Sequence, residues 1–246
     1  MTNSISITEN ILILNGDCRE ILHKNNLLSV DNAIIVSDPP FNVGYHYNEY
    51  VDKMDENEYY NMLEEIFSSH PSVVIHYPES LYKLSIRMNK APTRVVSWVY
   101  NSNTPRQHRD IAFFDCTPDF SKIKQPYKNP TDKRIQERMA NGLQGGNIYD
   151  WWEINQVKNV SKDKTLHPCQ MPLKVMLNIV GILPVDATII DPFMGSGTTG
   201  MACSLLGRKF IGIERDKKYF DICEQRLSGK IVIEEDAEDE DKIKLW

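Results

Sequence analysis

The order of apolar and polar positions along the chain predicts strands that alternate with helices. Several short apolar runs lack internal alternation, which is typical of strands buried on both faces of a sheet. These predicted strands are residues 11–14, 33–36, 73–77, 95–100, 111–114, 188–191 and 209–214. Between them, apolar residues recur at three- and four-residue intervals, which predicts helices. The predicted helices are residues 19–28, 55–67, 79–89, 173–182, 201–206 and 216–227.

This alternation predicts an α/β fold with a mostly parallel central sheet and helices on both of its faces. Ligands of such sheets bind at the carboxyl ends of the strands. Four predicted strands end at or near an acid, namely Asp17, Asp38, Asp191 and Glu214. One acid in this position is most often a helix N-cap. Core packing does not require four, so we expect a ligand site along this edge.

A glycine-rich stretch follows the strand at 188–191 and predicts a nucleotide-like ligand. It runs Asp191-Pro192-Phe193-Met194-Gly195-Ser196-Gly197-Thr198-Thr199-Gly200. Its glycines match G-x-G-x-x-G, and Glu214, nineteen residues after Gly195, suits a ribose diol. A P-loop would need Lys and Ser or Thr where Met201 and Ala202 stand, so that class is excluded. A dinucleotide site remains open.

The length and charge of the chain suggest one domain with two special segments. A chain of 246 residues can bury a sizeable core. We expect a single domain over residues 1–233 with an insertion at about 101–150, a polar tract too long for an ordinary connection. Residues 234–246 form an acidic tail that we expect to be disordered. Seven acids lie in 234–241, and without them the formal net charge changes from −6 to +1.

Within the polar tract, residues 122–138 hold six bases and two acids. A local basic segment is compatible with phosphate contacts even in an acidic chain. A solvated loop would have the same composition, so charge alone leaves both readings open.

Other features of the composition indicate a reduced cytoplasmic protein. No apolar run approaches the length of a membrane span, and the polar N-terminus lacks the features of a signal peptide. The five cysteines are scattered, without a Cys-x-x-Cys pair. We therefore expect no membrane association, no structural zinc and no other metal site.

Two motifs together resemble one enzyme family. Asp38-Pro39-Pro40-Phe41 resembles the D-P-P-[YF] motif of the DNA amino-methyltransferases, which methylate N6 of adenine or N4 of cytosine. Residues 191–200 resemble that family's S-adenosylmethionine loop, D-P-F-x-G-S-G-T-T. The catalytic motif comes first and the cofactor motif late, as in the permuted β group. The resemblance implies a Rossmann-like class I methyltransferase fold with circularly permuted motif order.

The resemblance also implies S-adenosylmethionine as the cofactor and assigns its contacts. These are Asp17, Cys18, Asp38, Thr165, His167, Asp191, Pro192, Phe193, Gly195, Ser196, Gly197, Thr198, Thr199, Glu214 and Arg215. Two positions depart from the family pattern. Phe41 stands where Tyr is more usual, and Met171 stands where Lys is frequent.

The chemistry expected of Asp38, Pro39, Pro40 and Phe41 can be stated physically. An exocyclic amine is a poor nucleophile because its lone pair is delocalised into the ring. The Asp38 carboxylate can accept one N–H, and the Pro39 carbonyl, in a turn stiffened by two prolines, can accept the other. Both contacts support charge that develops on nitrogen, while Phe41 stacks on the base. Such a pocket requires a base that has left the duplex stack.

The polar tract is then the candidate for DNA recognition. Its expected DNA contacts are Arg106, Arg109, Lys122, Lys124, Lys128, Lys133 and Arg134. We expect DNA as the partner, and the resemblance favours a homodimer, with a cognate restriction enzyme as a further candidate partner. Asp rather than Ser at the head of the catalytic motif favours adenine. Cytosine N4 is the close alternative, and an NAD(P)-dependent oxidoreductase or a non-catalytic DNA-binding module are more distant ones.

Overall fold

The computed structural model describes residues 3–46, 51–143, 145–157 and 170–230. Two of the expected cofactor contacts, Thr165 and His167, lie outside these residues, as does the acidic tail.

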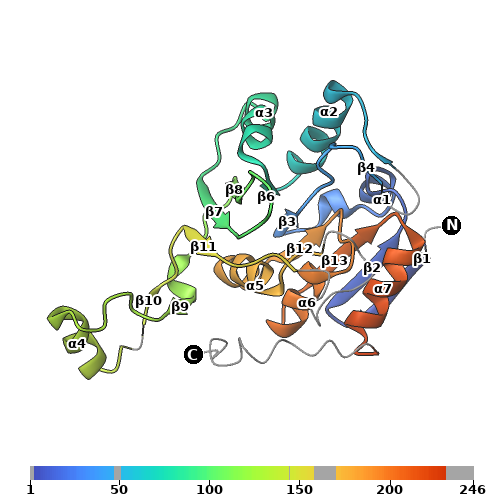
Figure 1. Cartoon of the computed structure of the whole chain (residues 1–246). Coiled ribbons are helices and arrows are strands. Elements are labelled where there is room, and N and C mark those ends of the chain that lie inside the picture. The colour runs from blue at the N-terminus through green and yellow to red at the C-terminus, as the bar shows by residue number, and fades with distance from the viewer. Residues whose placement is uncertain (1–2, 47–50, 144, 158–169, 231–246) are drawn as a thin grey trace.

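A nine-stranded sheet in the order β1-β2-β13-β12-β3-β6-β8-β7-β11 forms the centre of the described part of the chain (Figure 1). The strands are β1 (Asn3–Thr8), β2 (Ile11–Asn15), β3 (Ala33–Ser37), β6 (Ser72–His76), β7 (Arg94–Val99), β8 (His108–Phe114), β11 (Trp151–Glu153), β12 (Thr188–Asp191) and β13 (Phe210–Glu214). The five strands β2, β13, β12, β3 and β6 are mutually parallel. β1 and β8 run antiparallel to their neighbours. The expected mostly parallel sheet is thus confirmed.

Helices cover both faces of the sheet (Figure 1). One face carries α1 (Cys18–Lys24), α2 (Glu56–Phe67) and α3 (Pro78–Met88), and the other carries α5 (Leu173–Ile182), α6 (Thr198–Leu205) and α7 (Lys217–Leu227). Because neighbouring side chains of a strand point to opposite faces, Ile189 packs in one core and Ile190 in the other. This two-sided burial is the reason for the continuous apolar runs in the sequence.

Local capping explains where the helices begin. The Asp55 carboxylate accepts the backbone N–H groups of Asn57 and Glu58 and so starts α2 where the sequence predicts it. α6 begins at Thr198, three residues before the predicted start, because Gly197 adopts a left-handed conformation with φ +82° as its N-cap. A Cβ at Gly197 would also lie 2.4 Å from Cys223 Sγ, so only glycine fits this turn.

Three segments differ from expectation. The polar N-terminus contains β1, an edge strand that pairs antiparallel with β2. The helix expected at 19–28 ends at Lys24 and is followed by the 3-10 helix η1 (Leu27–Ser29). Residues 42–53, which lie outside every predicted strand and helix, contain β4 (Tyr45–His46) and β5 (Val51–Asp52), which pair antiparallel. The Asp52 carboxylate stabilises this hairpin by accepting the backbone N–H groups of Asn42 and Val43.

The polar tract contains an arm that projects from the sheet (Figure 1). After the 3-10 helix η2 (Phe120–Lys122), β9 (Lys124–Gln125) pairs antiparallel with β10 (Gly146–Asn147). Between these strands lies α4 (Lys133–Ala140), which has no buried residue. The arm therefore contributes little to the core. Within the described chain, no helix has the length and apolar character needed to cross a membrane.

Candidate active site

The four acids predicted at strand ends meet at one edge of the sheet. β2, β13, β12 and β3 are neighbours in the sheet, so Asp17, Glu214, Asp191 and Asp38 form a row. All four line one cavity with a volume of about 350 Å³. The turn at 38–41 and the glycine-rich loop also line this cavity, so both sequence motifs belong to one site.

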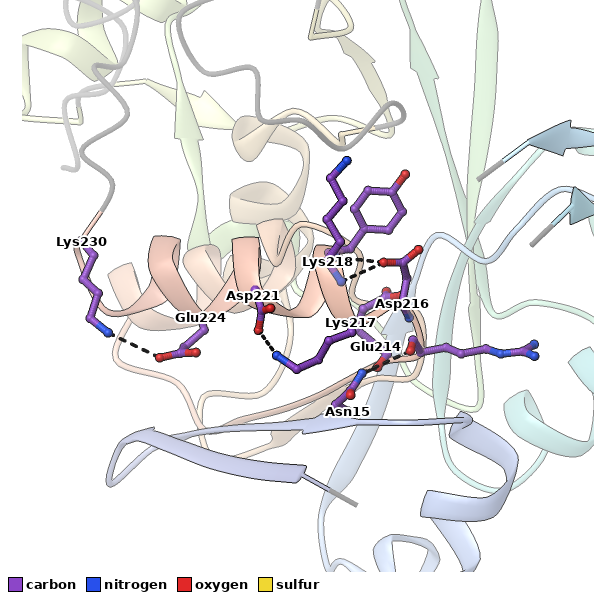
Figure 2. A network of polar contacts seen from close by, with 10 residues as sticks. Asn15, Glu214, Asp216, Lys217, Lys218, Asp221, Glu224 and Lys230 are labelled. Atoms are coloured by element: carbon purple, nitrogen blue, oxygen red, sulfur yellow. Dashed lines mark hydrogen bonds and ion pairs between the residues drawn. The ribbon is translucent and has the colours of Figure 1, made fainter. Parts of the chain in front are cut away.

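Glu214 lies at the end of β13 beside Asn15 (Figure 2) and connects this strand to the glycine-rich loop. Its carboxylate accepts the Gly195 N–H at 2.9 Å and the Asp216 N–H at 2.7 Å. The Asn15 side-chain amide donates to the Glu214 carbonyl at 2.9 Å and ties β2 to β13. Burial raises the pKa of Glu214 to about 7, although the two backbone N–H groups act to lower it.

Asp191 holds the glycine-rich loop in place. Its carboxylate accepts the Ser37 hydroxyl at 2.5 Å, the Thr199 hydroxyl at 2.6 Å and the Phe193 N–H at 3.1 Å. These bonds join β12 to β3 and to the start of α6. Burial raises the pKa of Asp191 to about 6, against the effect of the two hydroxyl groups. Both carboxylate oxygens are used by the protein itself.

Asp17 and Cys18 lie at the start of α1. The Asp17 carboxylate accepts the Arg19 N–H at 3.0 Å as the N-cap of α1 and pairs with the Arg19 guanidinium at 2.9 Å. The pKa of Asp17 is lowered, mainly by the hydrogen bond from the Arg19 side chain. Burial raises the pKa of Cys18 to about 12, so its thiol stays protonated.

Most of the other expected cofactor contacts also line the cavity. These are Pro192, Phe193, Gly195, Ser196, Thr198, Thr199 and Arg215. Gly197 does not line the cavity, and its assignment as a cofactor contact stays a prediction. Its Cα faces Cys223 of α7, and its contribution is the left-handed turn that starts α6.

The expected catalytic turn follows β3. The Asp38 carboxylate pairs with the Arg109 guanidinium at 3.4 Å between Oδ2 and Nη1, and the two side chains are 15% and 13% exposed. Oδ1 of Asp38 is buried and has no hydrogen-bond partner among the described residues. Burial raises the pKa of Asp38 to about 6; Arg109 lowers it and Asp191 raises it further.

Sequence reasoning missed a buried relay that ends on this turn. The Tyr77 N–H donates to His76 Nδ1 at 2.7 Å, so Nε2 carries the proton of the neutral ring. His76 Nε2 then donates to the Tyr59 oxygen at 2.7 Å, and the Tyr59 hydroxyl donates to the Pro40 carbonyl at 2.7 Å. Burial lowers the pKa of His76 to about 3, so the ring remains neutral. The available signal was the position of His76 at the end of a predicted strand.

Phe41 completes this cluster. Its ring centroid lies 4.5 Å from that of His76 and 4.9 Å from that of Tyr77. The Arg109 guanidinium carbon lies 4.5 Å from the same centroid. The Phe41 ring therefore packs against other side chains of the protein, and its stacking on a base stays a prediction.

Two of the expected DNA contacts, Arg109 and Lys122, bond groups at the sheet edge and at the end of α5. Arg109 lies inside the cavity against Asp38 and does not belong to an outer phosphate-binding surface. The Lys122 ammonium donates to the Leu183 carbonyl at 2.8 Å and so ties η2 to the end of α5. β8 and η2 thus bring these two side chains to other groups of the protein, and their contacts with DNA stay predictions.

The remaining basic residues lie on exposed parts of the tract. Arg106 pairs with Glu79 at 2.6 Å and Lys124 bonds Asn147 at 2.6 Å. Lys128 lies over the Tyr149 and Trp151 rings at 4.8 and 5.6 Å. Lys133 and Arg134 are exposed in the first turn of α4. These five can meet a polyanion, and nothing in the described structure prevents it.

The two tryptophans that directly follow the tract differ in burial. Trp152 is buried, whereas Trp151 is 48% exposed. Because neighbouring residues of β11 face opposite sides, one ring reaches the core and the other the surface.

The sheet order and the two motifs at its carboxyl edge define a class I methyltransferase fold. Solved structures share it: the M1.HpyAVI complex with SAM aligns with a TM-score of 0.57 at 21% identity, covering 88% of this chain and 99% of that one. The cytosine-N4-specific PvuII DNA methyltransferase aligns with a TM-score of 0.62 at 16% identity, covering 90% of this chain and 91% of that one.

Sequence relatives narrow this class to a family. The family model described as DNA methylase, which unites N6 and N4 methyltransferases, matches residues 33–225. The type II methyltransferase M.HpaI of Haemophilus parainfluenzae is 28% identical over 80% of this chain and 68% of its own length. The DNA adenine methyltransferase YhdJ of Escherichia coli is 24% identical over 87% of this chain and 82% of its own length. The chain belongs to the DNA methylase family.

This membership confirms the family that the motifs resemble, and it removes the oxidoreductase alternative. The comparisons also support S-adenosylmethionine as the cofactor, the ligand named in one of the aligned structures.

Proposed function

We propose that this protein transfers the methyl group of S-adenosylmethionine to the exocyclic N6 amine of a flipped-out adenine in DNA. One observation carries the proposal: the Asp38-Pro39-Pro40-Phe41 turn and the glycine-rich loop line the same cavity. A catalytic motif and a cofactor loop that are far apart in sequence thus face each other across one site.

The residues of the cavity fit the cofactor. Glu214 accepts two backbone N–H groups, and its carboxylate keeps lone pairs for the ribose hydroxyl groups. Phe193, Met176 and Tyr219 supply apolar and aromatic surface that suits a purine ring. The cofactor, when bound, supplies an electrophilic methyl group.

The turn after β3 prepares the target amine. The Asp38 carboxylate accepts one N–H, and the Pro39 carbonyl accepts the other, which turns the nitrogen lone pair toward the methyl group. Methyl transfer to this nitrogen would leave S-adenosylhomocysteine, and the surplus proton of the methylated amine would pass to water. Asp38 and Pro39 act by position and by stabilising charge that develops on nitrogen.

Two observations support adenine over cytosine. Asp38 stands at the head of the catalytic motif, where Ser is the other common residue. YhdJ, which aligns over most of the chain, is named a DNA adenine methyltransferase. Cytosine N4 is the second candidate, because PvuII methyltransferase has the same fold.

The test is methylation of unmodified genomic DNA, followed by sequencing that resolves modified bases. We expect N6-methyladenine in one sequence context; N4-methylcytosine would establish the alternative instead. Asp38→Ala is expected to lose at least about 100-fold in the rate of methyl transfer while binding S-adenosylhomocysteine normally. Asp31→Ala, at an exposed loop acid, is the matched control. Near wild-type transfer by Asp38→Ala would contradict the mechanism.

We also propose three properties that follow from the family. The protein works in the cytoplasm, as its bacterial relatives suggest, and it acts as a homodimer on DNA. A cognate restriction enzyme is its partner, because relatives such as M.HpaI are named type II methyltransferases. Light scattering with and without DNA tests the dimer, and protection of methylated DNA from a candidate nuclease tests the partner.

A further inference from the structure

Arg109 occupies an unusual place for a residue of a polar tract. It lies at the beginning of β8, and β8 runs antiparallel to β6. An antiparallel strand brings its first residues to the edge where its neighbours end. The pairing of His76 with Asp110 therefore places Arg109 beside the carboxyl ends of the parallel strands.

Aromatic rings and one carboxylate surround the Arg109 guanidinium. Its central carbon lies 4.5 Å from the Phe41 centroid, 5.4 Å from that of Trp98 and 5.8 Å from that of Tyr77. Cation–π contacts of this kind hold a planar guanidinium well. Its Nη1 lies 3.4 Å from Asp38 Oδ2, and the side chain is 13% exposed. The group is thus enclosed at the reacting end of the cavity.

We propose that Arg109 is a positioning residue for methyl transfer: its guanidinium keeps the Asp38 carboxylate ionised and oriented so that it can accept the N–H of the target amine. The inference rests on the proposed function and adds a residue to it. A carboxylate oxygen can accept more than one hydrogen bond, so Oδ2 can serve Arg109 and the amine together.

The surroundings of Asp38 explain why a cation is needed. Asp191 faces it from β12, Tyr59 from α2 and Tyr100 from the end of β7; the first is acidic and the others are uncharged. Burial and the Asp191 charge both favour the protonated acid, and Arg109 opposes them. A protonated carboxyl group offers a weaker acceptor to the amine. Loss of the cation should therefore move the protonation of Asp38 to higher pH.

The experiment compares the wild type with Arg109→Gln, Arg109→Lys and the control Arg87→Gln. Arg87 lies on α3, pairs with Glu64 at 3.6 Å and is remote from the cavity. Single-turnover methyl transfer is measured from pH 5.5 to 9 with saturating DNA and cofactor, and S-adenosylhomocysteine affinity is measured by calorimetry at pH 8.

We expect Arg109→Gln to move the acid limb of the rate profile upward by about one pH unit and to lower the rate at pH 7 about tenfold or more. Its affinity for S-adenosylhomocysteine should stay within about twofold of the wild-type value at pH 8. Arg109→Lys retains the charge, so its acid limb should remain near that of the wild type. The Arg87→Gln profile should match the wild-type profile.

An acid limb that is the same in Arg109→Gln and the wild type would overturn the proposal. If Arg109→Gln does not fold, Arg109→Lys still decides: an acid limb shifted upward by about one pH unit, although the charge is retained, would contradict a role of the charge. Absence of methyl transfer by the wild type on any DNA would instead overturn the proposed function.

Discussion

At the scale of single residues, several polar side chains of the site form their hydrogen bonds with other groups of the protein. Glu214 and Asp191 bind the loop that we propose receives the cofactor, and the Tyr59 hydroxyl binds the turn that we propose receives the base. Their shared task is to hold backbone in place, which few local sequence patterns reveal. The consequence is that small changes at these side chains should affect catalysis more than they affect folding.

Replacing Tyr59 by Phe removes the hydroxyl that bonds the Pro40 carbonyl and His76. We expect kcat to fall about tenfold, equivalent to one hydrogen bond of about 1.4 kcal/mol. S-adenosylhomocysteine affinity should not change, because Tyr59 holds the turn and not the glycine-rich loop. Tyr82→Phe, at a residue of α3 that is 66% exposed, is the control. An unchanged kcat would show that the relay has no role in positioning.

Glu214 should make cofactor binding depend on pH. Its pKa is raised by burial from the usual 4.5 to about 7, so the free protein holds a proton there below pH 7. Because the proposed contact of the ribose hydroxyl groups is with the ionised carboxylate, affinity for S-adenosylhomocysteine should rise with pH up to about 7 and stay constant above about 8. Calorimetry in buffers of different ionisation enthalpy should detect proton release near pH 6.

The raised pKa of Glu214 also makes the stability of the folded protein depend on pH. A folded-state pKa above the unfolded one stabilises the folded protein below pH 4.5, and this contribution is lost as pH rises through about 7. Glu214→Gln should remove the pH dependence of cofactor affinity near pH 7 and weaken binding about tenfold at pH 8. A pH dependence that persists in this variant would assign it to another group.

At the scale of elements, local patterns predicted which segments form strands and helices, but they did not predict which strands run antiparallel. The strands at 33–36 and 188–191 were predicted because burial on both faces leaves continuous apolar runs. The antiparallel direction of β8 follows from its pairing with β6 and β7, which has no local signature. β1 escaped prediction because an edge strand with polar alternation resembles a loop.

The arm between β9 and β10 allows a test of DNA recognition without loss of the fold. Replacing residues 126–145 by an Asn-Gly turn should keep the β9–β10 pair, since such turns join antiparallel strands. Because α4 has no buried residue, we expect Tm to change by less than about 4 °C. DNA affinity should fall about tenfold or more, since each lost phosphate contact reduces it.

Lys122→Met provides the contrast for this deletion. Its ammonium bonds the Leu183 carbonyl, so the substitution should cost about 1 kcal/mol of stability while DNA affinity stays within about twofold. Thermal unfolding and filter binding measure the two effects. Full DNA affinity in the arm deletion would show that recognition lies elsewhere.

At the scale of the whole molecule, charge is strongly divided along the chain. The formal net charge is −6, and it becomes +1 without the seven acids of residues 234–241. An acidic segment on the same chain can compete with DNA for basic groups, and salt screens such competition.

Replacing those seven acids by Gln or Ser should therefore raise non-specific DNA affinity at low salt. The difference from the wild type should shrink above about 0.5 M salt, where the Debye length falls toward a few ångströms. Fluorescence anisotropy with a random duplex at both ionic strengths makes the comparison. Equal affinities at low salt would rule out a moderating role for these acids.

Local sequence was sufficient for the strand-end acids, the two motifs, the cofactor and the family, because each depends on residues that are close together in the chain. Tertiary structure alone placed Arg109 against Asp38, joined His76 and Tyr59 to the Pro40 carbonyl, and bonded the Lys122 ammonium to the Leu183 carbonyl. These contacts depend on strand order and pairing direction, which arise from burial shared among distant segments. Asp38 was recognisable from its motif, whereas the groups that tune it became visible only in the folded chain.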